Sequence, residues 1–228
     1  MFPFFFDSTM LLLLPALLFA GWAQMKVRST FARYSQVRAQ SGVTADRVAR
    51  MLLDRFGLTS VPVNRVGGHL TDHYDPRGRT LSLSDAVYGN ASIAAIGVAA
   101  HEVGHAIQHS KGYAPLALRN DVVPVVNIGS SLAMPLFFIG FLFRGPVLMN
   151  LGIFLFLGVI AFHLVTLPVE YNASARAVEI LGQTGALTGS ELRGAESVLS
   201  AAAWTYVAAT LMAVMQLVRL LALRNSRD

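Results

Sequence analysis

The segment Asn90–His105 decides the fold; it runs Asn-Ala-Ser-Ile-Ala-Ala-Ile-Gly-Val-Ala-Ala-His-Glu-Val-Gly-His. Its alanine-rich, apolar part consists of good helix formers and predicts a buried helix. On such a helix His101 and His105 share one face, about 40° apart and one turn from each other. Two imidazoles so placed can bind one metal ion, and the Glu102 carboxylate beside them could accept a proton from a metal-activated water. The motif predicts a hydrolase; the alternative is a pair of core histidines bonded to their neighbours, with Glu102 exposed.

The composition places this helix in a membrane protein. Hydrophobic residues make up 54% of the chain, charged residues only 14%, and the mean hydropathy is +0.53. So apolar a chain predicts several membrane spans rather than an ordinary soluble domain. The chain has no cysteine, which excludes a thiolate zinc site, a disulfide scaffold and a cysteine nucleophile. Histidine and carboxylate side chains therefore remain as metal ligands.

Residues 1–25 are interpreted as an uncleaved transmembrane anchor. The uncharged run Met10–Met25 is just long enough to cross the hydrocarbon of a bilayer. A signal peptide would carry basic residues before its apolar core, whereas residues 1–9 offer only Asp7 as a charged group. The basic residues follow the run instead: Lys26, Arg28, Arg33 and Arg38. By the positive-inside rule, we expect the N-terminus outside and residue 26 onward in the cytoplasm.

Residues 26–121 are predicted to form a cytoplasmic, zincin-like catalytic part. They contain twelve of the eighteen lysines and arginines. A basic surface next to a bilayer is best explained by anionic lipid head groups, and no nucleic-acid-binding motif accompanies it. Within this part, residues 44–57 have apolar side chains at helical spacing and predict a surface helix of roughly three turns.

The chain between this helix and the metal helix has the pattern of β-strands. Residues 61–66 are rich in β-branched side chains, and residues 70–75 and 80–84 alternate apolar and polar residues around a Pro-Arg-Gly turn. This pattern predicts a hairpin in a small antiparallel sheet. An extended peptide could pair with a free edge of that sheet beside the metal helix. The alternative is a hairpin that only packs on the helix.

Residues 122–167 predict a transmembrane helical hairpin. The apolar runs 122–143 and 147–167 are each about 20 residues long, enough for one span. The chain therefore goes out and returns, so that Glu170 lies on the same side as the metal helix. A catalytic zinc takes three protein ligands and keeps one position open, which makes Glu170 the predicted third ligand. We expect a helix to start at Pro168, and the alternative is that Glu170 only caps this helix.

The C-terminal part divides into a third-ligand helix with a polar segment, residues 168–200, and an apolar helix, residues 201–228. A short polar helix over 190–197 is expected before the apolar stretch 198–223. This stretch is long enough to span, but three arginines would then emerge outside, against the charge rule: Arg219, Arg224 and Arg227. An interfacial or re-entrant helix fits them better, and the prediction is three or four spans in total.

Several motifs together resemble a known family. HEVGHAIQ is followed by the hydrophobic hairpin and by VEYNASARA, with LTDHYDPR, LSLS and VY upstream. This order is similar to the YugP-type neutral zinc metallopeptidases of bacterial membranes and, more distantly, to the HtpX and CAAX-prenyl-protease group. The resemblance implies a gluzincin-like zinc site with His101, His105 and Glu170 as ligands and Glu102 as the catalytic base.

The more distant group has an alanine three residues and an aspartate four residues after the third ligand. Ala173 fits this pattern, but Ser174 stands at the position of the aspartate. The group that orients a zinc histidine is then sought in Asn172, Ser174 or the hairpin residues 72–75.

The sequence therefore predicts a mainly α-helical, multi-pass protein of the cytoplasmic membrane, with a zincin-like HExxH helix and a small antiparallel sheet. We expect a Zn²⁺-dependent endopeptidase whose active site faces the cytoplasm and whose substrate is a peptide or membrane protein. Arg176 and Tyr171 are candidates for the oxyanion donor; the alternatives for them are a salt bridge to Glu179 and ordinary packing. A non-catalytic zinc-binding scaffold or regulator is the alternative function, but it would not need Glu102. A small transporter would need polar groups deep in several spans, and this chain has almost none.

Overall fold

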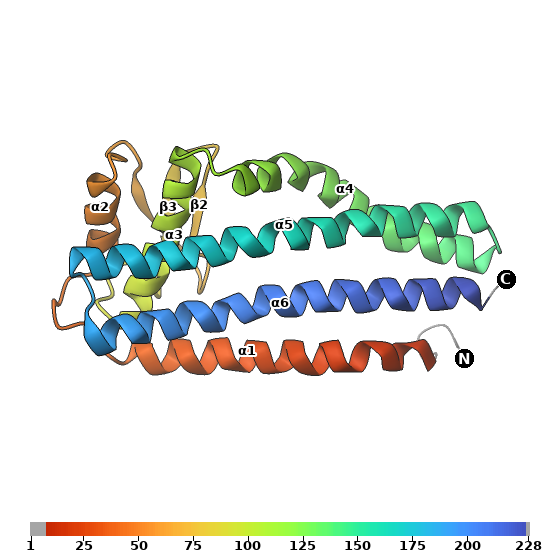
Figure 1. Cartoon of the computed structure of the whole chain (residues 1–228), viewed down its shortest axis with the longest axis horizontal. Helices are drawn as coiled ribbons and strands as arrows, with labels where there is room; N and C mark the ends of the chain where they lie inside the picture. Colours follow the sequence, from red (N-terminus) through yellow and green to blue (C-terminus); the bar gives the residue numbers. More distant parts are fainter. Residues whose placement is uncertain (1–7, 227–228) are drawn as a thin grey trace. The chain divides into compact units, whose positions relative to one another are not determined.

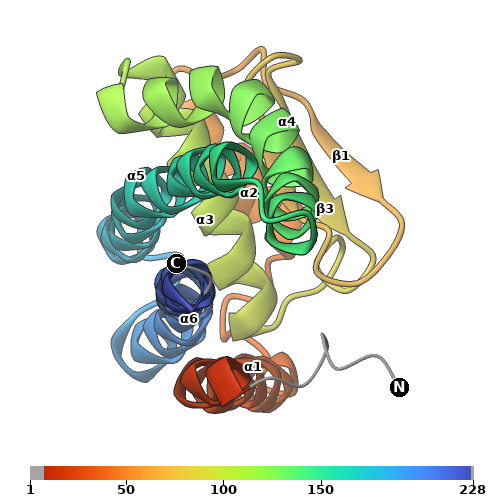
Figure 2. The same ribbon diagram turned by 90° about the vertical axis from the view of Figure 1, so that its right-hand side faces the viewer.

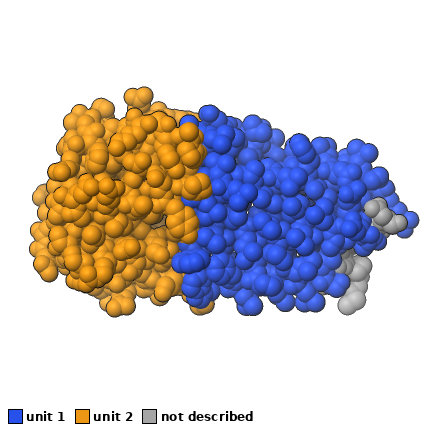
Figure 3. Space-filling view, in the orientation of Figure 1, with its two compact units in different colours: residues 1–24, 117–167, 204–228 blue, residues 25–116, 168–203 orange. Residues whose placement is uncertain are grey.

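The computed structural model describes residues 8–226, which are mainly helical with one small sheet (Figure 1). The predicted fold class is confirmed. The helices and strands occur in this order: η1 Ser8–Leu13, α1 Leu14–Ser35, α2 Ala45–Arg55, β1 Val63–Val66, β2 His73–Asp75, β3 Thr80–Ser84, α3 Ile93–Ser110, α4 Ala114–Leu142, α5 Pro146–Thr184 and α6 Gly189–Asn225. They form two compact units (Figure 3), here called the membrane unit, residues 1–24, 117–167 and 204–228, and the polar unit, residues 25–116 and 168–203.

The membrane unit consists of apolar helices. Four helices of the described chain are long and apolar enough to cross a bilayer: Ser8–Ser35, which includes η1, and α4, α5 and α6. Many of their apolar side chains in the membrane unit point outward, for example Leu18, Val125 and Phe154, which are 69–74% exposed. Side chains of this kind are suited to contact with lipid. The chain is a multi-pass membrane protein, and of the three or four predicted spans the structure supports four.

Within the membrane unit, α4 and α5 form a close antiparallel hairpin (Figure 2). Glycines allow the two backbones to approach: a Cβ atom at Gly152 would lie 2.6 Å from the Ala133 carbonyl oxygen, and one at Gly140 would lie 2.6 Å from the Met149 nitrogen. Small residues of this kind are typical of packed transmembrane helices. The turn between α4 and α5 falls between Leu142 and Pro146, where the two predicted apolar runs are separated.

Two predicted helix boundaries are wrong. The expected start at Pro168 does not exist, because α5 continues from Pro146 to Thr184 without a break. A proline removes one backbone donor, but a long apolar helix with packed neighbours tolerates that loss. The expected break near residue 197 is also absent, since α6 is one helix from Gly189 to Asn225. In α5 the polar segment follows the apolar span, and in α6 it precedes the span, and in each case both parts belong to one continuous helix.

The sheet of the polar unit has the strand order β1-β3-β2. β2 and β3 pair antiparallel, which confirms the predicted hairpin, whereas β1 pairs parallel to β3, with Val63 opposite Leu81. The prediction of an entirely antiparallel sheet is therefore wrong. β3 is the central strand, and its Leu81 and Leu83 are both fully buried. Alternation along a strand fixes its buried face but does not fix the direction of its neighbour.

Helix α3 passes through the core of the polar unit. The core contains side chains from α2, β3 and α3 that are at most 1% exposed: Leu52, Leu53, Leu81, Leu83, Ile96 and Ile107. α2 itself occupies most of the predicted helix over 44–57. The Ser92 hydroxyl caps the N-terminus of α3 by accepting from the Ala95 amide at 3.2 Å. A helix buried on nearly all sides gives the HExxH motif a rigid support.

Candidate metal centre

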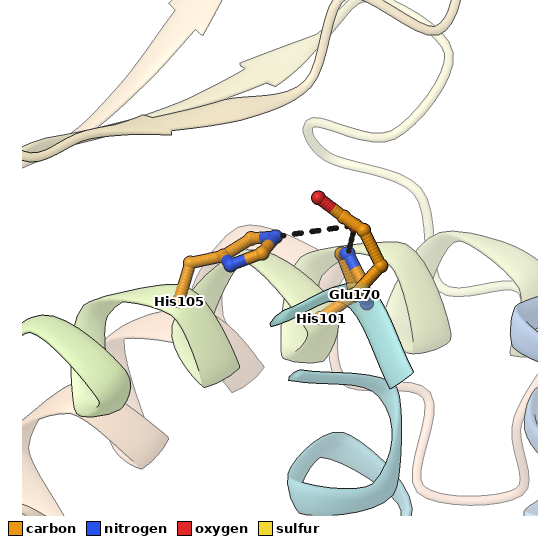
Figure 4. Close-up of side chains that lie close together, drawn as sticks. All are labelled: His101, His105 and Glu170. Atoms are coloured by element: carbon orange, nitrogen blue, oxygen red, sulfur yellow. Dashed lines mark hydrogen bonds and ion pairs between the residues drawn. The ribbon is translucent and has the colours of Figure 1, made fainter. Parts of the chain in front are cut away.

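Helices α3 and α5 bring three metal-ligating side chains together (Figure 4). The Nε2 atoms of His101 and His105 lie 3.2 and 3.6 Å from Oε2 of Glu170. One ligand atom from each of the three residues lies within 4.8 Å of the others. Glu170 is only 2% exposed and His105 is 9% exposed. Two imidazole nitrogens and one carboxylate oxygen are a donor set that zinc favours, and three protein ligands leave one position open for catalysis.

A glycine inside the motif makes this arrangement possible. A Cβ atom at Gly104 would lie 2.6 Å from the carbonyl oxygen of Ala173 on α5. The two backbones are therefore in contact one turn beyond Glu170, and any larger residue at position 104 would force them apart. Because Ala173 is only three residues from Glu170, this contact keeps the Glu170 carboxylate close to the histidine face of α3.

Both histidines also have a hydrogen-bond partner on Nδ1, the ring nitrogen that faces away from Glu170. Ser174 Oγ lies 3.1 Å from Nδ1 of His101, and Gln108 Oε1 lies 3.0 Å from Nδ1 of His105. Hydrogen bonds at Nδ1 leave Nε2 of each ring as the atom that faces Glu170. Metal-binding histidines usually have such a partner on the nitrogen away from the metal. The geometry of the residues present thus fits a bound zinc ion.

The remaining sequence candidates occupy different places. Asn172 Oδ1 accepts from the Gln108 side chain at 3.0 Å and from Nε of Arg176 at 2.7 Å. Tyr171 is 47% exposed. In the hairpin, Asp72 accepts from the backbone amide and hydroxyl of Ser84, at 2.7 and 2.9 Å. Asp72 thus has a role within the sheet, while Ser174 contacts the candidate zinc ligand His101 directly.

Asp75 and Glu179 also have local partners. Asp75 accepts from the backbone amides of Arg77 and Gly78 in the hairpin turn, at 2.9 and 3.1 Å. Glu179 accepts from Gln183 at 2.9 Å. The carboxylate of Asp75 therefore stabilises the turn, and Arg176 bonds to Asn172 one turn earlier on the helix.

The carboxylate that follows His101 is buried. Glu102 is 8% exposed, which contradicts the alternative interpretation in which it faces solvent. Burial lowers the pKa of His105, but the Glu170 carboxylate and the charge of Glu102 outweigh it, so the pKa of His105 is raised above its ordinary value. The site therefore has a negative electrostatic character, which suits a cation.

Sequence reasoning missed two partners of the metal helix. Gln108 is fully buried and bonds to His105. Its position three residues after His105 places it on the same side of a helix, and this spacing was a usable signal. The second is Tyr74 on β2, whose hydroxyl lies 2.9 Å from Nδ1 of His109. That contact depends on how the sheet packs on α3, which no local pattern reveals.

Comparisons with known proteins agree with this geometry. A family model described as "Putative neutral zinc metallopeptidase" matches residues 9–225. The chain belongs to this family. A relative from Bacillus subtilis (strain 168), named "Putative membrane protease YugP", is 49% identical over 219 residues, which are 95% of this chain and 97% of the relative. No solved structure matches the chain.

Membership of the neutral zinc metallopeptidase family identifies the cofactor. The family is one of zinc peptidases, and the described chain groups His101, His105 and Glu170 as the candidate zinc site. The resemblance found in HEVGHAIQ and VEYNASARA is thereby confirmed at the level of the family. The two motifs lie on α3 and α5, the two helices that meet at the site.

Proposed function

We propose that the protein is a membrane-bound zinc endopeptidase in which His101, His105 and Glu170 bind the metal and Glu102 is the general base. The observation that carries this proposal is the meeting of three ligand atoms from α3 and α5 within 4.8 Å. A buried carboxylate next to this cluster supplies the fourth functional group. Membership of a zinc metallopeptidase family supports hydrolysis of peptide bonds as the reaction.

Zinc bound at this site would polarise the carbonyl of the scissile peptide bond and lower the pKa of the attacking water. Glu102 accepts the proton of that water and later donates it to the nitrogen of the leaving amine. Its burial keeps the carboxylate away from competing bulk water. The proton thus moves from water to Glu102 to the amine, and the carboxylate is regenerated after each turnover.

The side chains around the ligands have positioning roles in this proposal. Ser174 orients His101 through Nδ1, in the place where the more distant families have an aspartate. Asn172 and Arg176 form a polar chain along α5 next to Glu170. Arg176 and Tyr171 remain the candidates for the donor that stabilises the tetrahedral oxyanion.

The charge distribution supports a cytoplasmic active site. Thirteen of the eighteen lysines and arginines lie in the polar unit, which also contains all three ligands. The positive-inside rule then places this unit in the cytoplasm and its basic surface near anionic lipid head groups. We expect the substrate to be a peptide or a membrane protein, and the free edge of β2 offers backbone groups to an extended chain.

A zinc-binding scaffold without turnover is the alternative function. It would use the histidines and Glu170 but would have no use for the buried Glu102 carboxylate, which costs free energy to bury. This observation favours the peptidase.

The test compares the purified wild type with the Glu102→Gln variant, both loaded with zinc. We expect both to bind zinc, while Glu102→Gln cleaves protein or peptide substrates at least about 10²- to 10⁴-fold more slowly, as expected for loss of a general base. Glu196→Gln, at an exposed position on α6, is the matched control and should cleave like wild type. Equal cleavage by wild type and Glu102→Gln would contradict the peptidase mechanism.

A further inference from the structure

Gln108 is the one fully buried polar side chain that contacts both helices of the candidate metal centre in the described chain. It is 0% exposed and comes from α3, one turn after His105. Its Oε1 lies 3.0 Å from Nδ1 of His105. Its Nε2 donates to the carbonyl oxygen of Val169 at 2.8 Å and to Oδ1 of Asn172 at 3.0 Å. These contacts use both ends of the amide, so a substitution that keeps only one end separates their effects.

The partners of Gln108 fix the direction of its amide group. The Val169 carbonyl can only accept, so the NH₂ group of Gln108 must face it. Asn172 Oδ1 is fixed as an acceptor in the same way, because it also accepts from Nε of Arg176, and a guanidinium can only donate. The other end of the amide, Oε1, therefore faces His105 as an acceptor.

This direction determines which nitrogen of His105 carries the proton. Because Oε1 of Gln108 accepts, Nδ1 of His105 must donate, and the neutral ring then has its lone pair on Nε2. Nε2 is the atom that lies 3.6 Å from Glu170 in the ligand cluster. The chain of hydrogen bonds thus prepares His105 to bind a metal through Nε2.

Gln108 also contacts the backbone next to the third proposed ligand, Glu170. Val169 immediately precedes Glu170 on α5, and its carbonyl is the one that Gln108 holds. One buried amide therefore links a ligand on α3 to the backbone beside a ligand on α5. We infer that Gln108 is a positioning residue that sets the tautomer of His105 and couples this ligand to Glu170, with Arg176 and Asn172 as its anchor. This inference rests on the proposed metal site.

Two variants separate the two contacts. Gln108→Met keeps the approximate volume but removes both hydrogen-bonding ends. Gln108→Glu keeps an acceptor toward His105 but removes the donor toward Val169 and Asn172. Gln183→Met is the matched control, because Gln183 lies exposed on the same helix as Glu170.

The experiment measures zinc affinity by competition with a chelator, and the tautomer of His105 by ¹⁵N NMR of the zinc-free, histidine-labelled protein at a pH where the ring is neutral. We expect Gln108→Met to bind zinc about 10- to 100-fold more weakly, a typical effect of losing a second partner of a metal ligand. Its His105 should lose the preference for a proton on Nδ1. Gln108→Glu should keep the wild-type tautomer and still bind zinc more weakly, and Gln183→Met should match wild type in both measurements.

Wild-type zinc affinity and tautomer in Gln108→Met would overturn the inference. If Gln108→Met does not fold, wild-type zinc affinity in Gln108→Glu would overturn the coupling to Glu170, and a changed tautomer in that variant would overturn the role at His105. Failure of the wild type itself to bind zinc would instead contradict the proposed metal site, so the two failures are distinguishable.

Discussion

At the scale of single residues, the site depends on two imidazole rings that are fixed on both sides. Nε2 of His105, the proposed metal-binding atom, lies 3.6 Å from Oε2 of Glu170, and Nδ1 of the same ring is hydrogen-bonded to Gln108. His101 has the same arrangement with Glu170 and Ser174. The partners on the far side, Gln108 and Ser174, are both neutral. The negative charge of the site therefore comes from Glu170 and Glu102.

Acidification is predicted to weaken zinc binding but to stabilise the fold of the zinc-free protein. Burial opposes protonation of His105, but Glu170 and Glu102 raise its pKa above the ordinary 6.5. Protons therefore compete with zinc already above that pH, and zinc affinity should fall by about tenfold per pH unit for each proton displaced. In the zinc-free protein the raised pKa stabilises the fold below the unfolded-state pKa, and this contribution is lost as the pH rises through the folded-state pKa.

Chelator competition and thermal unfolding in the presence of EDTA, both measured across this pH range, check the prediction. Zinc affinity that does not change with pH would contradict it. So would a zinc-free protein whose thermal stability rises as His105 loses its proton.

The proposed ligands and the proposed base could be predicted from the sequence, three of them from local helical spacing and one from the membrane topology. His101, Glu102 and His105 follow from the geometry of a single helix. Glu170 follows from the number of spans that separate it from the motif. Gln108 and the contact between Tyr74 and His109 were not predicted, since they depend on how α5 and β2 pack on α3.

At the scale of helices and strands, the close contact between α3 and α5 is the feature that builds the site. Two predictions from the sequence fail at this scale. The sequence predicts a helix start at Pro168 and an antiparallel sheet, whereas α5 is continuous and β1 is parallel to β3. Helix propensity and alternation are properties of one segment alone. The continuity of α5 and the direction of β1 depend instead on packing against neighbouring helices and strands.

Gly104→Ala is predicted to separate α3 from α5. The new Cβ would lie 2.6 Å from the Ala173 carbonyl oxygen, so the backbones must move apart. We expect a loss of about 1–3 kcal/mol in the free energy of unfolding, as for other overpacked sites, and weaker zinc binding because Glu170 moves away from the histidines. Chelator competition and thermal unfolding measure the two effects.

The control for this prediction is Gly158→Ala. Gly158 also lies in a helix, but a Cβ atom there would meet nothing within 4 Å. Its variant should bind zinc like wild type. Equal zinc affinity of Gly104→Ala and wild type would show that the close approach of α3 and α5 is not needed for the site.

At the scale of the whole molecule, the described helices support four spans, and the excess of lysine and arginine in the polar unit leads us to propose that this unit lies in the cytoplasm. Stacked and edge-to-face rings of Phe19, Trp22 and Trp204 lie in the membrane unit at 5.5–6.1 Å from one another. Tryptophan is enriched where helices leave the hydrocarbon, and Trp22 lies just before the first segment of the polar unit in the sequence, while Trp204 directly follows its last segment. The sequence alone leaves the fourth span open because the arginines near the C-terminus oppose the charge rule.

The absence of native cysteines allows a direct test of this orientation. Ser41 and Ser226 are both exposed, the first in the polar unit and the second beyond the end of α6. In intact cells or sealed vesicles of the same orientation, a membrane-impermeant maleimide should label Ser226→Cys, whereas it should label Ser41→Cys only after permeabilisation. Labelling of both variants from the same side would contradict four spans, and the reversed pattern would contradict a cytoplasmic polar unit.

The central claim is that side chains from two distant segments of the chain, the HExxH motif and α5, bind one zinc ion. Zinc stoichiometry and affinity in wild type and Glu170→Gln test it most directly, with Glu179→Gln on the same helix as the control. We predict one zinc per wild-type chain, an unchanged control, and a loss of affinity in Glu170→Gln larger than the roughly 10- to 100-fold effect of an outer partner. Wild-type zinc binding by Glu170→Gln would contradict the account.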